Sequence, residues 1–375
     1  MSMNRVFFII LIFAFLVIPL SINNVNDDGI SYFDLVVEIS ENLFENTKIE
    51  EKEIISLTED QKQLISEKFQ VLTNSNNYLL NNFEEIQNEN LKEINEYIAI
   101  NRWQEFSDTN NGIKGIYLSG YHFLEEEKID SIKNILSNTV VNTIVLDVKT
   151  DNGHLLYDSQ IPDVEELKNK RIKYDTQTLK SFKEESNIYL IGRVVAFQDP
   201  IFSRTYPESA ITDVLTSKPY SQDGQYFLDP SDSASREYIL NVALEACLLG
   251  FDEIQFDYIR YPDTNYQGLV YDDENNSENR TKNINSFLQN ATKLLHDNGC
   301  LASADIFGYV LNAKNDNGIG QYLETIVNTV DFISPMVYPS HYSKGSFGYS
   351  YPNNFPYEVV TAALNDGLSR GVQEK

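Results

Sequence analysis

Hydrophobic residues recur with two different periods along the chain after about residue 112. Short runs with a period of two alternate with longer runs with a period of 3.6, which is typical of strands that alternate with helices. The expected strands are 115–119, 143–149, 188–197, 253–258, 301–306 and 332–338. The expected helices are 125–136, 165–169, 176–185, 235–249, 283–298, 320–328 and 357–368. This alternation predicts an α/β fold with parallel strands and right-handed crossovers.

Two observations favour a barrel over an open doubly wound sheet. The first strand is followed by Ser119-Gly120-Tyr121-His122, which is not a glycine-rich phosphate turn. Polar residues instead follow the ends of several strands, where (β/α)8 barrels build their active sites. We therefore predict a (β/α)8 TIM-barrel type fold. Because only six βα units precede Lys375, we expect a barrel that is truncated after about six units or completed by a second polypeptide.

The first 111 residues follow another pattern. Residues 6–20 form an apolar run after Arg5, a length that suits a secretory signal better than a full membrane span of ~20 residues. We expect residues 1–22 to be a signal peptide or an N-terminal anchor, with 6–20 as the membrane tether, and the protein to be secreted or held at the extracellular face. Residues 23–111, rich in Glu, Asp, Asn and Lys, predict an acidic helical spacer before a barrel at 112–375.

Charge and composition exclude several classes of function. A formal net charge of -27 disfavours nucleic acid and makes a neutral or cationic partner more natural. The four histidines show no ligand spacing, so we expect neither a metal site nor a cofactor. Cys247 and Cys300 both lie in apolar helix-to-strand segments, which favours buried thiols over a disulfide. The oligomeric state is left open.

One parity of each expected strand carries polar side chains. On the fourth strand, Gln255 and Asp257 alternate with Ile254 and Phe256. The corresponding positions of the other strands are Asp147, Lys149, Arg193, Ser303, Asp305, Ser334 and Tyr338. Because a barrel interior is normally filled by branched aliphatic residues, this polar parity predicts a pocket. We expect three carboxylates, those of Asp147, Asp257 and Asp305, to converge there with Lys149 and Arg193 between them.

Three carboxylates and two cations can push carboxyl pKa values apart, so that one acid keeps its proton while its neighbour ionises. Glycoside hydrolysis uses two carboxylates in this way without a metal, a nucleotide or a thiol. The sequence contains no G-x-S-x-G elbow for serine chemistry. Two other interpretations are a structural ion pair of Asp257 with Arg260 or Lys149, and a divalent-cation site built from the three aspartates.

Several stretches resemble the putative glycoside hydrolase domain family, a former domain of unknown function with a barrel akin to the amylase-like glycosidases. The stretches that carry the resemblance are 144–149, 192–200, 250–262, 303–308 and 334–339, of which Gly-Phe-Asp-Glu-Ile-Gln-Phe-Asp-Tyr-Ile-Arg-Tyr-Pro at 250–262 is the most specific. The resemblance implies that Asp257 is the nucleophile. The fifth-strand acid of such relatives is usually a glutamate, whereas this chain has Asp305.

The sequence thus predicts an exported glycoside hydrolase that acts on a polysaccharide, with Asp257 and Asp305 as catalytic residues. The predicted substrate-binding residues are Asp147, Lys149, Arg193, Gln255, Tyr258, Arg260 and Tyr338. The alternative is a non-catalytic glycan-binding or wall-associated module with a degenerate barrel. A separation of ~5 to 10 Å between the Asp257 and Asp305 carboxyls would fit catalysis.

Overall fold

The computed structural model describes residues 76–120 and 126–372. The expected signal or anchor at 1–22, its tether at 6–20, and residues 23–75 of the expected spacer lie outside these ranges. Within the described residues, no helix combines the length and the apolar character needed to cross a membrane.

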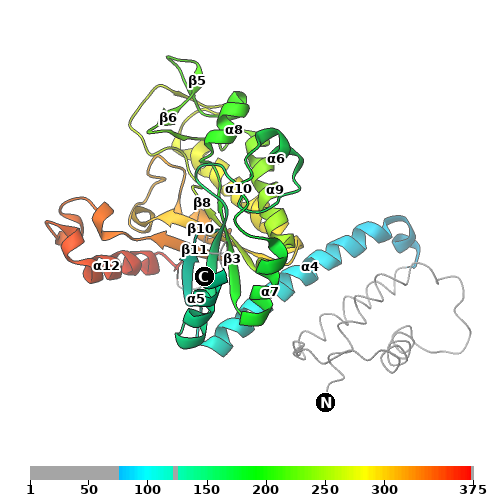
Figure 1. Cartoon of the computed structure of the whole chain (residues 1–375). Coiled ribbons are helices and arrows are strands. Elements are labelled where there is room, and N and C mark those ends of the chain that lie inside the picture. Colours follow the sequence, from blue (N-terminus) through cyan, green and yellow to red (C-terminus); the bar gives the residue numbers. More distant parts are fainter. Residues whose placement is uncertain (1–75, 121–125, 373–375) are drawn as a thin grey trace, which may run out of the picture. The chain divides into compact units, whose positions relative to one another are not determined.

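All six expected strands are present and form one parallel sheet (Figure 1). Their order across the sheet is β1 (Gly115–Leu118), β2 (Thr143–Lys149), β3 (Tyr189–Val195), β8 (Glu253–Asp257), β10 (Leu301–Phe307) and β11 (Phe332–Met336). The sheet curls into a half-barrel of the TIM-barrel type, which confirms the α/β prediction at this level. The expected truncation stays a prediction.

Helices cover the outer face of the sheet between successive strands. They are α5 (Glu126–Asn138), α7 (Thr176–Ser186), α9 (Ser233–Leu248), α10 (Ser277–Asp297) and α11 (Leu323–Val327). Two further helices lie elsewhere: α6 (Pro162–Leu167) lies at the carboxyl ends of the strands, and α12 (Pro356–Ser369) follows the last strand. Asp175, Asp232 and Asn276 cap the first turns of α7, α9 and α10 by accepting a backbone N–H three residues later. Gly250 follows α9 with a φ of 105°, so it ends that helix as the sequence predicts.

The period of two holds on the central strand. Ile254 and Phe256 are fully buried beneath the helices, and Phe256 meets Phe287 of α10 edge to face with ring centroids 5.4 Å apart. The opposite parity, Gln255 and Asp257, faces the concave side. The helix-facing half of each strand therefore supplies the core, and the concave half is left for polar groups.

The long connection after β3 adds a small structure at the carboxyl ends of the strands (Figure 1). It contains α8 (Pro200–Thr205), η3 (Pro207–Ser209), the strands β4 (Thr212–Asp213) and β5 (Lys218–Pro219), and the hairpin β6 (Ser221–Gln222)–β7 (Gln225–Tyr226). The connection after β8 adds β9 (Leu269–Val270), which pairs with β4 and completes a three-stranded antiparallel sheet in the order β5-β4-β9. Short 3-10 turns follow β10 and β11: η4 (Gly308–Leu311), η5 (Pro339–His341), η6 (Ser346–Gly348) and η7 (Pro352–Asn354).

The helix α4 (Asn76–Asn110) packs its later turns against the amino ends of the strands. The rings of Trp103 and Phe332 lie 4.8 Å apart, and those of Phe106 and Tyr189 lie 5.8 Å apart. Residues from Asn88 onward belong to the same compact unit as the sheet. The expected boundary between spacer and barrel, at 111/112, therefore falls inside this compact unit, between the last turns of α4 and the strands that they cover.

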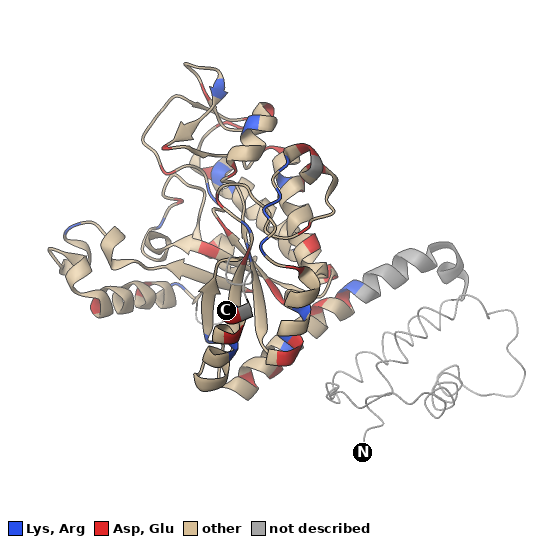
Figure 2. Cartoon of the chain, in the orientation of Figure 1, with Lys and Arg blue, Asp and Glu red and all other residues tan. Residues whose placement is uncertain are grey.

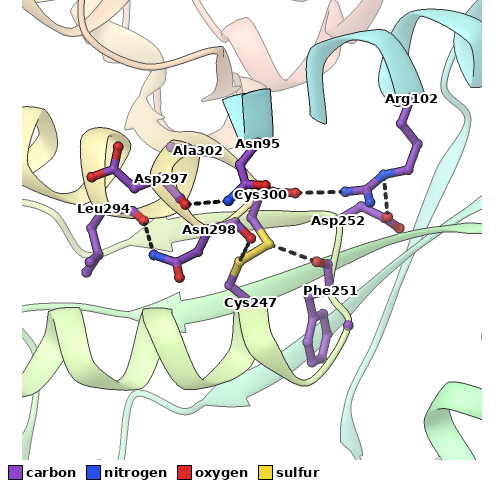
Figure 3. The surroundings of a disulfide bond; sticks show 12 residues. Asn95, Arg102, Cys247, Phe251, Asp252, Leu294, Asp297, Asn298, Cys300 and Ala302 are labelled. Carbon is purple, nitrogen blue, oxygen red and sulfur yellow. Dashed lines mark hydrogen bonds and ion pairs between the residues drawn. A yellow bond between two sulfur atoms is a disulfide. The ribbon is translucent and has the colours of Figure 1, made fainter. Parts of the chain in front are cut away.

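Cys247 and Cys300 form a disulfide, with Cα atoms 6.0 Å apart (Figure 3). The prediction of two buried thiols was wrong, although both side chains are buried. The physical reason is topological, because the last turn of α9 and the residue before β10 both lie at the amino end of the sheet. The bond ties that helix to the strand 53 residues later.

Candidate functional site

The site is built on a row of polar residues across neighbouring strands. Asp147 of β2 is in register with Arg193 of β3, and Arg193 is in register with Gln255 of β8. Asp257 comes two residues after Gln255, at the end of its strand. Parallel pairing without offset thus brings these side chains to the same end of the concave face, as the sequence predicts.

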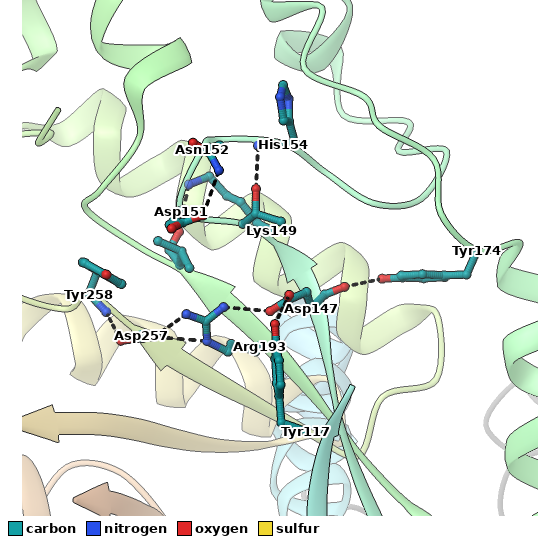
Figure 4. A network of polar contacts seen from close by, with 12 residues as sticks. Tyr117, Asp147, Lys149, Asp151, Asn152, His154, Tyr174, Arg193, Asp257 and Tyr258 are labelled. Carbon is teal, nitrogen blue, oxygen red and sulfur yellow. Dashed lines mark hydrogen bonds and ion pairs between the residues drawn. The ribbon is translucent and has the colours of Figure 1, made fainter. Parts of the chain in front are cut away.

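Arg193 joins two of the predicted carboxylates (Figure 4). Its Nη1 donates to Asp147 at 2.7 Å, while Nη2 and Nε both donate to Oδ2 of Asp257 at 2.5 and 3.1 Å. Burial works against the charge of Arg193, but Asp257 and Asp147 outweigh it and raise the pKa of the guanidinium. The bridge therefore stays charged at any physiological pH.

Tyr117 extends the network to the edge strand β1. Its hydroxyl donates to the second oxygen of Asp147 at 2.5 Å, although 55% of the side chain is exposed. Burial of the hydroxyl and the hydrogen bond to Asp147 raise the pKa of Tyr117 to about 12. Tyr174 adds a hydrogen bond of 3.1 Å to the carbonyl of Asp147. Asp147 is thus fixed from three sides.

Asp257 has its charge stabilised by donors on both oxygens. Arg193 occupies Oδ2, and the backbone N–H of Tyr258 donates to Oδ1 at 2.7 Å. That N–H is aimed by a left-handed backbone at Tyr258, with a φ of 51°, a conformation that a non-glycine residue adopts at some energetic cost. The ion-pair partner of Asp257 is Arg193 and not Arg260 or Lys149.

Asp305 lies next to Asp257 on the neighbouring strand. Each follows directly after the last paired residues of their two strands, Phe256 and Ala304. Burial, followed by the charge of Asp257, raises the pKa of Asp305 well above its usual range, while Arg193 and the Ser334 hydroxyl oppose the rise. Ser334 also accepts a hydrogen bond of 2.9 Å from Gln255. A carboxyl whose pKa is raised thus lies beside one that accepts hydrogen bonds on both of its oxygens.

Lys149 does not join this group. A register shift between Asp147 and Lys149 leaves Lys149 opposite Val194 instead of on the parity of Asp147. Its ammonium is fully buried, 2.9 Å from Asp199 and 2.8 Å from the carbonyl oxygen of Val195. The expectation of Lys149 between the three aspartates is corrected here, because one bulged residue changes the face of the strand that a side chain occupies.

The remaining predicted residues lie after the strands. Tyr258 places its ring 5.0 Å from the guanidinium carbon of Arg260, which is itself buried. Tyr338 is 52% exposed after β11, and its ring contacts His341 at 5.3 Å. Among the described residues, Tyr338 makes no hydrogen bond with the aspartates, in contrast to Tyr117 on the opposite edge of the sheet.

Sequence reasoning missed Glu253. This carboxyl lies on the parity of Gln255 and Asp257 but at the amino end of β8, and it is buried. Burial raises its pKa to about 7, with the hydroxyls of Ser303 and Tyr189 opposing the rise. Its shared parity with Asp257 is the signal that could have identified it.

The arrangement suits proton transfer between a protonated and an ionised carboxyl. Among the residues that the structure describes, no three His, Cys, Asp or Glu side chains are grouped so that they could hold a metal ion. The divalent-cation interpretation of Asp147, Asp257 and Asp305 therefore has no geometric support, because Arg193 occupies the space between two of them.

The chain is similar to several known proteins. A hypothetical protein from Ruminiclostridium thermocellum ATCC 27405 is 33% identical over 51% of this chain and 96% of its own, with a TM-score of 0.46. The glycoside hydrolase domain of PgaB (BpsB) from Bordetella bronchiseptica is 12% identical, over 69% of this chain and 82% of its own, with a TM-score of 0.50, and this likeness shows the fold alone. Among curated proteins, none matches. The family model described as "Putative glycosyl hydrolase domain" matches residues 115–374, and the chain belongs to that family.

Proposed function

We propose that this protein is an exported glycoside hydrolase that cleaves a polysaccharide with two carboxylates, Asp257 and Asp305. The observation that carries the proposal is the contrast between these neighbours. Arg193 and the Tyr258 N–H donate hydrogen bonds to Asp257, whereas burial and the charge of Asp257 raise the pKa of Asp305. Paired carboxyls with opposite protonation are what the reaction requires.

Each residue then has a defined task. Asp305 gives its proton to the glycosidic oxygen as the bond to the anomeric carbon breaks. Asp257 forms the new bond to that carbon, or deprotonates the water that does so. In the first case a water molecule later releases the sugar and returns its proton to Asp305. Asp147 and Tyr117 hold Arg193 in place, and their exposed edge is available to sugar hydroxyls.

The strand positions favour the covalent route. Neighbouring parallel strands lie about 4.8 Å apart, and Asp257 and Asp305 are at equivalent positions on adjacent strands. Retaining glycosidases hold their carboxyls about 5 to 5.5 Å apart, whereas inverting enzymes need roughly 6.5 to 9.5 Å. We therefore propose retention of configuration, which NMR of the first-formed anomer would check.

Export is proposed from two independent features. The apolar run at residues 6–20 has the length of a signal or anchor. The disulfide between Cys247 and Cys300 is of a kind that persists in oxidising compartments outside the cytoplasm. We propose that residues 1–22 direct export and that the acidic segment after them is a spacer before the catalytic domain.

The decisive experiment is a screen of the purified full chain against bacterial wall and capsule polysaccharides, followed by Asp257→Asn. We expect Asp257→Asn to lower kcat by at least about a thousandfold, while the melting temperature stays within a few degrees because Arg193 keeps Asp147. Glu324→Gln is the matched control. Glu324 also accepts two hydrogen bonds from one arginine, Arg370, but lies on the outer helix α11.

Two outcomes would reject the assignment. Full activity in Asp257→Asn would remove that residue from the mechanism. Glycan binding by the wild-type chain without any turnover across the screen would favour the non-catalytic glycan-binding module instead. Equal loss in Asp257→Asn and Glu324→Gln would show that the effect comes from folding.

A further inference from the structure

Arg260 is a buried cation without a carboxylate partner. Among the described residues no acidic side chain lies within ion-pair distance of it, and Nη1 donates to the carbonyl oxygen of Tyr261 at 3.0 Å. The other arginine of the site, Arg193, is half-buried and has two aspartates. A buried charge that lacks a counter-charge costs several kcal/mol, so it calls for an explanation.

Aromatic rings surround the guanidinium of Arg260. Its central carbon lies 4.8 Å from the ring centroid of Phe307, 5.0 Å from that of Tyr258 and 5.3 Å from that of Phe227. Each ring face attracts the cation through its negative electrostatic potential. Burial still lowers the pKa of Arg260, with the charges of Tyr258, Asp263 and Asp257 opposing it. The cage therefore fixes the direction of the guanidinium without neutralising it.

The cage borders the candidate catalytic pair. Arg260 comes three residues after Asp257, and the ring of Tyr258 between them packs on its guanidinium. Phe307 comes two residues after Asp305 on the same strand. Arg260 keeps 8% of its surface accessible to solvent. Each of its side-chain nitrogen atoms either has a hydrogen-bond partner or is accessible to solvent. The donors that lack a protein partner therefore face solvent.

We propose that Arg260 forms a subsite for an oxyanion substituent of the glycan, either the carboxylate of a uronic acid or an ester phosphate or sulfate. A guanidinium presents parallel N–H donors that match such groups in a bidentate geometry. The rings of Tyr258 and Phe307 would pack on the sugar that carries the substituent. This inference rests on the proposed function to the extent that the ligand is a glycan.

The charge of the whole chain limits which acidic glycans fit. A net charge of -27 repels dense polyanions, so the ligand should carry isolated acidic groups among neutral sugars. Basic residues are gathered at one segment before Tyr174, where Lys168, Lys170, Arg171 and Lys173 lie within six residues. Figure 2 shows basic segments on the loops at the end of the sheet where α6 lies.

The test is a binding comparison on the full chain by calorimetry. The probes are an oligosaccharide of alternating uronic acid and neutral sugar, the same oligosaccharide after carboxyl reduction, a phosphate-substituted counterpart and a glucosamine oligosaccharide. We expect the wild type to bind one acidic probe at least tenfold tighter than the reduced one, and Arg260→Met to lose that preference while binding of the reduced probe changes less than twofold. The acidic probe that binds tighter identifies the substituent.

Arg204→Met is the matched control, since Arg204 of α8 also packs on one ring, that of Tyr226 at 4.8 Å, but is exposed. We expect it to retain the preference. If Arg260→Met does not fold, Arg260→Gln gives the same test. The proposal is overturned if the wild type shows no preference, if both probes weaken equally in Arg260→Met, or if the glucosamine probe binds tightest.

Binding and turnover separate this inference from the proposed function. An Arg260-dependent preference without hydrolysis of any glycan would refute the hydrolase proposal and leave the subsite intact. Hydrolysis that depends on Asp257, together with equal binding of the acidic and reduced probes, would support the hydrolase proposal and refute the Arg260 subsite.

Discussion

The two ends of the parallel sheet carry similar residues in different settings. At the amino end, the Asp252 carboxylate takes a hydrogen bond of 2.9 Å from the N–H of Leu190 and ion pairs of 2.7 Å with Lys183 and 3.1 Å with Arg102. Figure 3 shows how Arg102 of α4 reaches over this region to Asp252, beside the disulfide. Both oxygens of the Asp252 carboxylate thus have protein partners, which is typical of structural polar groups.

At the carboxyl end, by contrast, the charges are only partly matched by the protein. Asp147, Arg193 and Asp257 form a closed set, but the pKa of Asp305 is raised, and Arg260 keeps donors without partners among the described residues. Exposed Tyr117 and Tyr338 flank this end, whereas Trp103 and Phe106 cover the other. The difference teaches that satisfied polar groups mark the scaffold, and that incompletely satisfied ones mark the place for a ligand.

The largest effect that sharpens this contrast is expected from Asp305→Asn. If Asp305 is the general acid, activity of the wild type should fall as pH rises through its raised pKa, because the acid loses its proton. Asp305→Asn should lower kcat on polysaccharide about 10² to 10⁴-fold and abolish that alkaline limb on aryl glycosides, whose leaving groups need no proton. A pH profile in which the limb persists in the variant would assign the proton to another group.

The next largest effect is expected at the amino end of the sheet, which α4 covers. Replacing Cys247 and Cys300 by alanine removes a cross-link over 53 residues, which we expect to cost about 4 kcal/mol of unfolding free energy. Denaturant unfolding of the oxidised wild type and the double variant would measure it. Activity at a permissive temperature should stay unchanged. Loss of activity in a variant that is still folded would show that the two ends are coupled.

Glu253→Gln should give the smallest of these effects, which is a change in how the stability of the folded protein depends on pH. The folded pKa of Glu253, about 7, lies above the ordinary value of 4.5, so its stabilising contribution is complete below pH 4.5 and is lost as pH rises through 7. The difference corresponds to roughly 3 kcal/mol. We expect thermal unfolding of the wild type to weaken over that window and the variant to weaken less. If the stability of both proteins falls with pH in the same way, the group that titrates is not Glu253.

The strands and the convergence of three aspartates could be predicted because both follow from local patterns. Alternation at Ile254, Gln255, Phe256 and Asp257 shows which side chains face the helices, and parallel pairing then aligns the strand ends. The ends of β2 agree with the prediction to the residue.

The misses share one cause, which is that they depend on contacts between distant segments. The sequence Leu-Asp-Val-Lys at 146–149 contains no sign of the register shift that removes Lys149 from the site. The partner of Cys247 depends on where α9 ends in space, and the role of Trp103 depends on the docking of α4. Periodicity carries no information on such pairings.

The left-handed turn at Tyr258 links the two arginines of the site. One backbone conformation aims its N–H at Asp257, which Arg193 holds, and lays its ring on Arg260. A glycine at this position would relax the backbone but leave Arg260 without one wall. The chain therefore couples, through a single residue, the carboxylate proposed to react with a sugar and the cation proposed to choose which sugar enters.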